Sequence, residues 1–400
     1  MTPTAVDLLT PAVRQRVRSL ATRAADELPA YLTDLTALRR HVATVRAAIP
    51  PGVELFYAVK ANPDPPVLGV LAGHVDGFEV ASGGELAHVR ATLPTARLAF
   101  GGPGKTEAEL VIALRSGVDR LHVESLLELR QLASVAERLG VVADVLLRVN
   151  LPLQPAVPVP LAMRGPFGMD PASLPVALAV LDASRSVRLC GLHVHLVSGM
   201  SAVDCLALAA DVLGWARSWA ADSGVRLAEI DLGGGMDVDY RAPGARFDWA
   251  AYGAGLARLA GGMPGVRLWI EPGRALTAYA GFYATRVLDV KFSAGRAYAV
   301  VAGGTHHLRT PAARQHAQPF AVVAVEEWPA TWPRPGVVDA PVTVVGQLCT
   351  PKDVLAADVP VAAARAGDVL VFALAGAYAW NISHRDFLMH PPPRFHHLED

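Results

Sequence analysis

Short runs of β-forming residues alternate with helical stretches from about residue 54 onward. Each run ends in polar residues or glycines, and the eight runs are ELFYAVKA (54–61), GFEVAS (77–82), RLAFGG (97–102), RLHVES (120–125), DVLLRVN (144–150), LCGLHVHL (189–196), AEIDLGGG (228–235) and RLWIEPG (267–273). The stretches between them carry apolar residues at helical spacing, as in SLLELRQLASVAERLG with Leu126, Leu129, Leu132, Val135 and Leu139. Strands that alternate with helices predict βαβ units and a parallel sheet.

Eight βαβ units predict an α/β fold, a closed (β/α)8 barrel of the TIM type, over residues 31–280. A doubly wound open sheet is the alternative. That fold usually has fewer strands and a GxGxxG motif near the first of them, which this sequence lacks.

The pattern changes beyond about residue 280. Strand-like runs such as RAYAVVAGG, FAVVAVEEW, PVTVVGQLC and DVLVFALAG are separated by turns rich in proline and glycine, and helical patterning is sparse. We therefore expect a C-terminal all-β domain over residues 281–400, with a loop at 329–341. Residues 1–30 have helical patterning and are expected to pack against either the β domain or the barrel.

Composition and charge narrow the function further. The chain has 400 residues, 52% of them hydrophobic, and a formal net charge of −1, which favours neither nucleic acid nor an anionic membrane as a partner. Neither a signal-peptide pattern nor a run of 18 apolar residues is present. Three cysteines cannot form a disulfide framework, so we expect a reducing, cytoplasmic setting.

The active site of a (β/α)8 barrel lies at the carboxyl ends of its strands. The first predicted strand ends at Lys60, one of only four lysines in the chain. A buried lysine has a lowered pKa, which frees its amine to form a Schiff base with an aldehyde. The alternative is a lysine that merely reaches out to solvent from a strand end.

The sixth predicted strand carries His193 and His195, which alternate and therefore face the same side. Zinc binding is one interpretation, but the histidine pairs at 306–307 and 396–397 supply no recognisable third ligand by their spacing. We therefore predict no metal, and an imidazole packed flat on a planar ring. A hydrogen-bonded core histidine remains the alternative for His193.

The last two strands end in residues suited to a charged ligand. Gly233, Gly234 and Gly235 would expose backbone N–H groups to an anion such as phosphate, although three glycines can also be a simple turn. Glu271 would need a cationic partner, either a protonated pyridine nitrogen or a nearby arginine. An aldehyde-binding lysine, a stacking histidine, a phosphate loop and this carboxylate together fit pyridoxal 5′-phosphate (PLP).

The chain resembles the fold-type III PLP-dependent decarboxylases, which include diaminopimelate, ornithine and biosynthetic arginine decarboxylases. The motifs that carry the resemblance are YAVKAN (57–62), FEVASGGEL (78–86), GLHVHLVSG (191–199), DLGGG (231–235), EPGR (271–274), GQLCTPKDVL (346–355) and GAYAWNIS (376–383). The resemblance implies an alanine racemase-like barrel with a β domain, and a cofactor joined to Lys60. It further implies a cofactor site made of Lys60, His195, Ser198, Gly233, Gly234, Gly235, Glu271, Gly273, Arg274 and Tyr378.

The same resemblance implies how the substrate is handled. Cys349 would protonate the carbon after CO2 leaves, and it would reach the active site from the other subunit of a homodimer. Asp353 would contact the substrate together with Arg274 and Tyr378. A buried, inert thiol is the alternative for Cys349.

Three departures from the family pattern bear on the substrate. Val197 stands where glycine is usual, Glu79 where aspartate is frequent, and Thr350 where diaminopimelate decarboxylases usually carry glutamate. Without that carboxylate the distal ammonium of diaminopimelate would be unpaired. CTPKDVL, HLVSG and AYAWNISHRDFLMHPPP instead resemble a sub-branch in siderophore biosynthesis, whose members decarboxylate an amino acid amide-linked to citrate or a similar acid.

An anionic distal group would need cations or hydrogen-bond donors, for which Arg164, His384 and Arg385 are candidates. Other hypotheses remain open: a decarboxylase of a free diamino or basic acid (diaminopimelate, ornithine, arginine or lysine), one of a carrier-linked amino acid, and a non-catalytic PLP-binding regulator. Alanine racemases share the fold, but they lack the GQLC segment.

Overall fold

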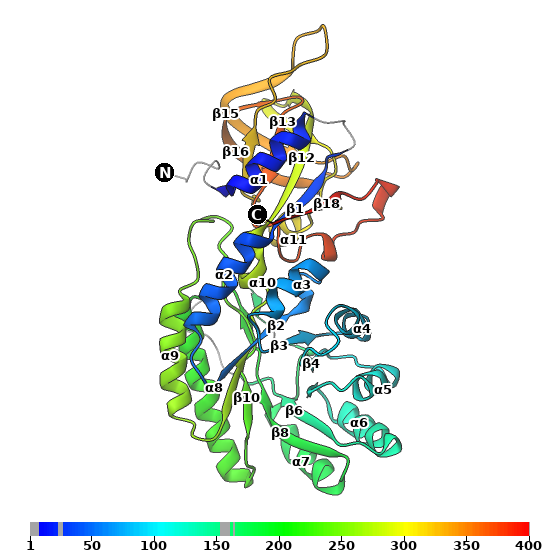
Figure 1. Cartoon of the computed structure of the whole chain (residues 1–400), viewed down its shortest axis with the longest axis vertical. Helices are drawn as coiled ribbons and strands as arrows, with labels where there is room; N and C mark the ends of the chain where they lie inside the picture. The colour runs from blue at the N-terminus through cyan, green and yellow to red at the C-terminus, as the bar shows by residue number, and fades with distance from the viewer. Residues whose placement is uncertain (1–7, 23–26, 153–160, 163–164, 400) are drawn as a thin grey trace. The chain divides into compact units, whose positions relative to one another are not determined.

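A computed structural model describes residues 8–22, 27–152, 161–162 and 165–399, and it divides into two compact units (Figure 1). One unit comprises 41–237 and 247–276, and the other the described parts of 1–40, 238–246 and 277–400. Within the described residues, no helix combines the length and the apolar character needed to cross a membrane.

The first unit contains a closed barrel of eight parallel strands in the order β10-β11-β2-β3-β4-β5-β6-β8. Its strands are β2 (Val53–Ala58), β3 (Gly77–Val80), β4 (Leu98–Phe100), β5 (Arg120–Val123), β6 (Ala143–Arg148), β8 (Val187–His193), β10 (Glu229–Asp231) and β11 (Arg267–Ile270). All eight predicted strands are thus confirmed, and the open sheet is excluded. Each strand ends earlier than its apolar run, so the residues with candidate chemistry lie in the turns just beyond the strands.

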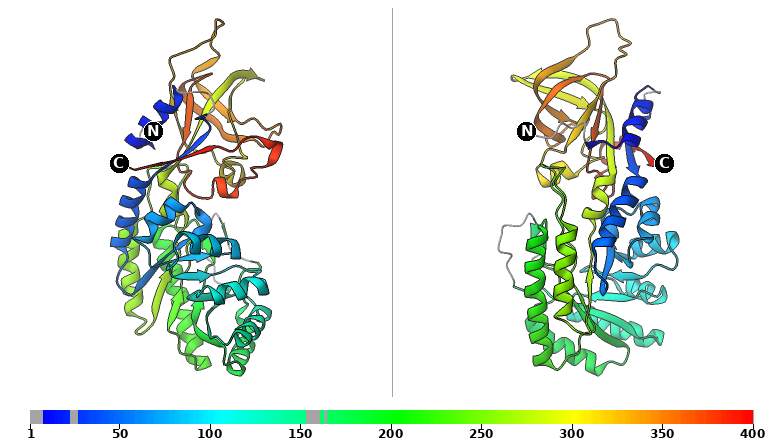
Figure 2. Two further views of the ribbon diagram at one scale, coloured as in Figure 1. Left: turned by 45° about the vertical axis from the view of Figure 1, so that its right-hand side comes forward. Right: turned by 60° about the vertical axis from the view of Figure 1, so that its left-hand side comes forward.

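Helices follow the barrel strands along the chain, and the pair α8 and α9 runs side by side (Figure 2). The helices are α2 (Leu35–Ala48), α3 (Pro65–Ala72), α4 (Gly83–Thr92), α5 (Glu107–Arg115), α6 (Leu126–Leu139), α7 (Leu174–Ala183), α8 (Ala202–Ser223), α9 (Trp249–Gly261) and α10 (Arg274–Thr277). The predicted apolar stripe of α6 buries Leu129, Leu132 and Val135. Ser125 caps this helix by accepting the N–H of Glu128, so the local sequence fixes where it begins.

The second unit is built on an eight-stranded mixed sheet, as the sequence predicts for the C-terminal part. Its strands are β1 (Ala30–Asp34), β12 (Gly281–Ser293), β13 (Arg296–Val301), β14 (Phe320–Val323), β15 (Gly336–Val345), β16 (Val354–Arg365), β17 (Val369–Phe372) and β18 (Arg394–Leu398). Tyr283, Phe372 and Val344 are fully buried in its core. The short helix α11 (Thr310–Arg314) follows β13.

The N-terminal part of the chain belongs to this β unit. Helix α1 (Pro11–Ala21) buries Val13, Val17 and Leu20, and the carbonyl of Ala21 accepts a hydrogen bond from Arg286 of β12. Strand β1 pairs with β12 and β18. Of the two packing partners expected for residues 1–30, the described residues therefore contact the β unit.

The structure differs from the expected boundaries in two places. Residues 31–40 and 238–246, which we expected in the barrel, group with the β unit. Within 329–341, expected to be a loop, strand β15 begins at Gly336 and pairs with β16. The valines of this segment were available as a strand signal, but the surrounding prolines concealed it.

Candidate active site

Lys60 lies in a short 3-10 turn, Val59–Ala61, directly after β2. Its Nζ donates to Glu79 Oε2 over 2.6 Å, and its side chain is 44% exposed whereas that of Glu79 is 5% exposed. The expectation of a buried lysine is therefore wrong. The amine is exposed at the strand end, and a buried carboxylate on β3 holds it in position.

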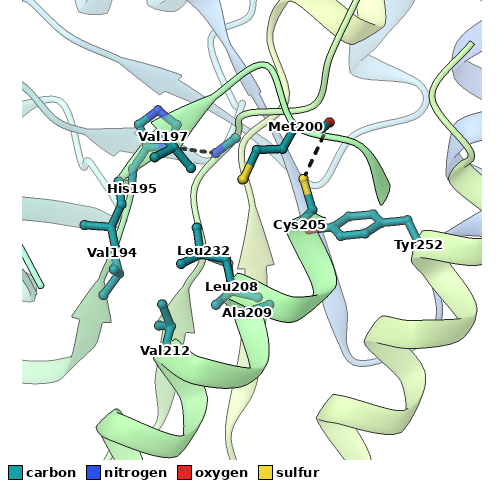
Figure 3. Close-up of a pocket in the computed structure, with 12 residues that line it drawn as sticks. Val194, His195, Val197, Met200, Cys205, Leu208, Ala209, Val212, Leu232 and Tyr252 are labelled. Atoms are coloured by element: carbon teal, nitrogen blue, oxygen red, sulfur yellow. Dashed lines mark hydrogen bonds between the residues drawn. The ribbon is translucent and has the colours of Figure 1, made fainter. Parts of the chain in front are cut away.

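His195 is fixed by the glycine loop (Figure 3). Its Nδ1 accepts the N–H of Gly234 over 3.2 Å, and burial lowers the pKa of His195 to about 3. A side chain at Gly233 would place its Cβ 2.6 Å from His195 Nδ1, so glycine is required for the ring to lie there. The structure thus provides a neutral imidazole in a fixed orientation beside the loop.

The other two glycines leave similar room for an approaching group. A Cβ at Gly234 would lie 2.5 Å from the carbonyl of Glu271, and one at Gly235 would lie 2.6 Å from the carbonyl of Val197. Gly235 also has a φ of +106°, which favours glycine. Ser198, in the two-residue strand β9 (Val197–Ser198), precedes Gly199, whose N–H bonds to the carbonyl of Gly235. The predicted phosphate residues therefore lie in adjacent loops.

Gly273 and Arg274 follow β11 and begin the short helix α10. A Cβ at Gly273 would lie 2.9 Å from the Cβ of Ala61, the residue after Lys60. The backbone of this segment therefore passes against the turn that carries Lys60, and it belongs to the same end of the barrel.

An apolar pocket adjoins the glycine loop (Figure 3). Its lining includes Leu208, Val212, Leu232, Tyr252 and Cys205. Burial raises the pKa of the Cys205 thiol to about 12, and it also raises the pKa of Cys190. Both are therefore poor proton donors or nucleophiles, in contrast to Cys349, which is exposed.

Glu271 lies in a buried cluster with His122, His193 and Asp231. Its Oε2 is 3.5 Å from His193 Nε2, and its Oε1, 3.9 Å from His122 Nδ1, has no hydrogen-bond partner. Burial is the main reason that the pKa of Glu271 lies well above its ordinary value, and the same cause raises the pKa of Asp231. We conclude that the two carboxyls hold at least one proton at neutral pH.

The charges around this cluster are already paired. Arg148 donates to Glu124 over 2.8 Å, Lys105 is 2.7 Å from Glu128, and Lys60 is paired with Glu79. A buried carboxyl oxygen of Glu271 without a partner therefore needs a donor from a ligand.

Four predicted residues lie in the β unit. Cys349 is exposed, and Tyr378 adopts a φ of +49°, an uncommon conformation for a residue with a side chain. His384 is exposed as well. Asp353 departs from its expected role, because it is buried and its two oxygens accept from Thr305 and Leu348. We therefore reassign it from substrate contact to loop positioning. Arg164 lies outside the described residues.

A family described as "Pyridoxal-dependent decarboxylase, pyridoxal binding domain" matches residues 35–278. The chain belongs to this family. The decarboxylase is 38% identical over 380 residues to the 2-[(L-alanin-3-ylcarbamoyl)methyl]-2-hydroxybutanedioate decarboxylase of Staphylococcus aureus (strain NCTC 8325 / PS 47), with 92% of this chain and 93% of the relative covered. It is 31% identical to the L-glutamyl-[BtrI acyl-carrier protein] decarboxylase of Niallia circulans over 92% of this chain and 88% of the relative.

Solved structures agree with this assignment at the level of the fold. The diaminopimelate decarboxylase of Helicobacter pylori complexed with L-lysine superposes with a TM-score of 0.83 at 24% identity, covering 96% of this chain and 94% of that chain. The predicted family, fold and enzyme class are thereby confirmed, and PLP is the cofactor.

The residues of the decarboxylase fit PLP. The orphaned Glu271 Oε1 matches a protonated ring nitrogen, and the glycine loop leaves room that any side chain would fill. His122, His193, Asp231 and Glu271 also offer two nitrogens and two carboxylate oxygens within 4.8 Å of one another, a set that a divalent cation could use. Since Glu271 is the residue that the ring nitrogen needs, we assign this cluster to the cofactor.

Three members of the site went unrecognised in the sequence. Asp231 directly precedes the three glycines, so an acid at the end of a predicted strand was available as a signal. Glu79 stood out only as a departure from the family pattern. His122 lies inside a strand, where a single histidine gives no periodic signal, and its ring is 4.2 Å from that of His193.

The raised pKa of Asp231 predicts a pH-dependent stability. A carboxyl whose pKa is raised by folding stabilises the fold most at low pH, and this contribution falls as the pH rises through the raised pKa. Asp231→Asn, which resembles the protonated acid, should therefore give a shallower decline in unfolding temperature from mildly acidic to mildly alkaline pH. The cofactor-free protein should be used, with Asp182→Asn, an exposed carboxyl on α7, as the control. Parallel pH profiles for the parent and Asp231→Asn would contradict the buried pair.

Proposed function

We propose that the decarboxylase removes the α-carboxylate of an amino acid that is amide-linked to a citrate-type acid. The name of the Staphylococcus aureus relative describes such a compound: an alanine whose third carbon is joined through an amide to a 2-hydroxybutanedioate carrying a carbonylmethyl arm. Identity of 38% along nearly the whole of both chains is the observation that carries the proposal. Thr350, in place of an acid after Cys349, agrees with it, because the substrate has no distal ammonium to pair.

When bound, PLP withdraws the electron pair that CO2 leaves behind. The chain's own residues prepare this. Lys60 carries the cofactor, and Glu79 keeps the lysine amine in place over 2.6 Å. Glu271, next to Asp231, would accept the ring-nitrogen proton, and His195 would lie flat against the ring with its neutral imidazole. Ser198, the glycine loop and the Gly273–Arg274 backbone would bind the phosphate.

Cys349 is our candidate for the acid that protonates the carbon after CO2 has left. Its exposure leaves the thiol accessible, whereas Cys190 and Cys205 are buried. We infer that it acts in the active site of a second copy of the chain, so that the enzyme works as a homodimer with shared active sites. Tyr378 is proposed to contact the cofactor, and Arg274 and Tyr378 the substrate.

The likely product suggests a purpose. A hydroxy-carboxylate supplies hard oxygen ligands, which suit ferric iron, so we place the reaction in siderophore biosynthesis. Three free cysteines agree with a reducing, cytoplasmic setting.

A carrier-linked amino acid is the second candidate substrate, because the Niallia circulans relative covers 92% of this chain at 31% identity. The test is CO2 release from purified, PLP-loaded enzyme offered each compound separately: citryl-diaminopropionate, carrier-linked glutamate, diaminopimelate, ornithine, arginine and lysine. We expect release from the citryl conjugate and little from the others. No release from any of them would instead favour a PLP-binding regulator.

A further inference from the structure

Three loops of the β unit are tied into one platform, which we define as residues 303–309, 346–353 and 378–391. Asp353 joins the first two: Oδ1 accepts from the N–H and hydroxyl of Thr305 over 2.6 and 2.8 Å, and Oδ2 accepts from the Leu348 N–H over 2.8 Å. Ser383 joins the third, since its hydroxyl accepts from the Arg309 N–H over 3.2 Å and donates to the carbonyl of His307 over 3.0 Å. Cys349 follows Leu348 and is therefore part of the platform.

His306, at the centre of the platform, is a buried polar side chain that the described chain does not satisfy. It has no exposed surface, and neither ring nitrogen has a hydrogen-bond partner. Its neighbour His307, by contrast, contacts the Tyr283 hydroxyl at 3.0 Å and the Pro391 carbonyl at 3.1 Å. Leaving a buried group unsatisfied costs about 1–3 kcal/mol, so a group used only for packing would be apolar.

The surroundings of His306 offer hydrogen-bond donors and positive charge. The ring of His390 lies 5.1 Å from that of His306 and is half-buried. The platform also carries four exposed basic or ionisable side chains, Arg309, Lys352, His384 and Arg385. Its buried carboxylate, Asp353, is already used by three donors, and its other carboxylate is the exposed Asp386. Such a surface suits an anion and would not hold a distal ammonium.

Burial lowers the pKa of His306 to about 4 and that of His307 to about 3, so both rings are neutral near pH 7. A neutral imidazole still donates one N–H. His306 therefore provides a buried donor without introducing a buried charge, while the exposed cations supply the charge.

We propose that this platform binds the carboxylates of the distal, citrate-type half of the substrate, with His306 as its buried hydrogen-bond donor. This inference rests on the proposed function and deepens it. It also gives one platform two tasks, since the platform that holds the distal group carries the Cys349 thiol. The strained backbone of Leu388 and Met389, with φ of +60° and +58°, is consistent with a functional constraint on the segment that carries His384 and His390.

The test uses citrate as a probe of the distal half. PLP-loaded parent enzyme should be inhibited competitively by citrate, and His306→Leu should raise both the inhibition constant of citrate and the KM of the citryl conjugate by about 10- to 100-fold, with kcat nearly unchanged. His306→Gln, which keeps a donor, should retain most of the affinity. Slow decarboxylation of free diaminopropionate, which has no distal group, should be the same in all three proteins.

A charge-matched pair on the surface gives a second test that does not depend on a core substitution. Arg385→Ala should weaken citrate inhibition severalfold, whereas Asp386→Ala, its neighbour, should leave it unchanged or strengthen it. If the parent decarboxylates the conjugate but His306→Leu and Arg385→Ala retain parental citrate inhibition, the platform is wrong and the proposed function stands. If the parent neither decarboxylates the conjugate nor responds to citrate, both are wrong.

Discussion

Replacing Lys60 by alanine should abolish the visible absorption band of the Schiff base and lower the rate of CO2 release by about 10³–10⁴-fold. The amine of Lys60 is held 2.6 Å from Glu79 at the end of β2, where it would bind the cofactor aldehyde. Without it, PLP would be retained only by its phosphate and ring contacts. Absorption spectra and CO2 release from the same preparation measure both effects.

Lys291→Ala provides a matched control, because Lys291 is an exposed lysine of β12 in the other unit. It should keep the band and the activity. Borohydride reduction of the parent followed by peptide mapping should place the cofactor on the peptide that contains Lys60. A reduced cofactor on any other lysine would remove Lys60 from the site.

Replacing Cys349 by alanine should leave the visible band intact but slow product formation by about 10²–10³-fold, because a proton donor is lost while the cofactor remains bound. Cys205→Ala is the control, since its thiol is buried in the apolar pocket and has a raised pKa. An unchanged rate in Cys349→Ala would exclude this thiol as the proton donor.

Mixing the two inactive variants tests the sharing of active sites between subunits. If Cys349 acts in the partner's site, a heterodimer of Lys60→Ala and Cys349→Ala chains has one site with both residues intact, and random exchange should restore about a quarter of the parental activity. Each variant alone remains inactive. Failure to recover activity after subunit exchange has been demonstrated would mean that both residues act within one chain.

The barrel was predictable because each βα unit carries its own signal in a short window. Every apolar run, from ELFYAVKA to RLWIEPG, became one strand, and the stripe of α6 faces inward as its spacing predicts. The pairing of β1 with β18 had no such signal. It joins Ala30 to Arg394, so it depends on contacts between residues far apart in the sequence.

The site was predictable to the extent that its residues end strands. Lys60, His195 and the three glycines follow from that rule, and the family resemblance adds Cys349. The environment of each residue was not predictable, because burial depends on the whole fold. Lys60 is exposed rather than buried, and Asp353 is buried and fully hydrogen-bonded rather than free for substrate. His306 showed only as half of a histidine pair until the platform loops were seen together.

An internal competition tests most directly whether a citrate-linked amino acid is the substrate. Equal concentrations of citryl-diaminopropionate and diaminopimelate would be incubated in D2O with the PLP-loaded enzyme, and both would be followed by mass spectrometry. We expect the conjugate to lose CO2 and gain one deuteron on carbon while diaminopimelate remains. Consumption of diaminopimelate before the conjugate would keep the decarboxylase assignment and overturn the proposed substrate.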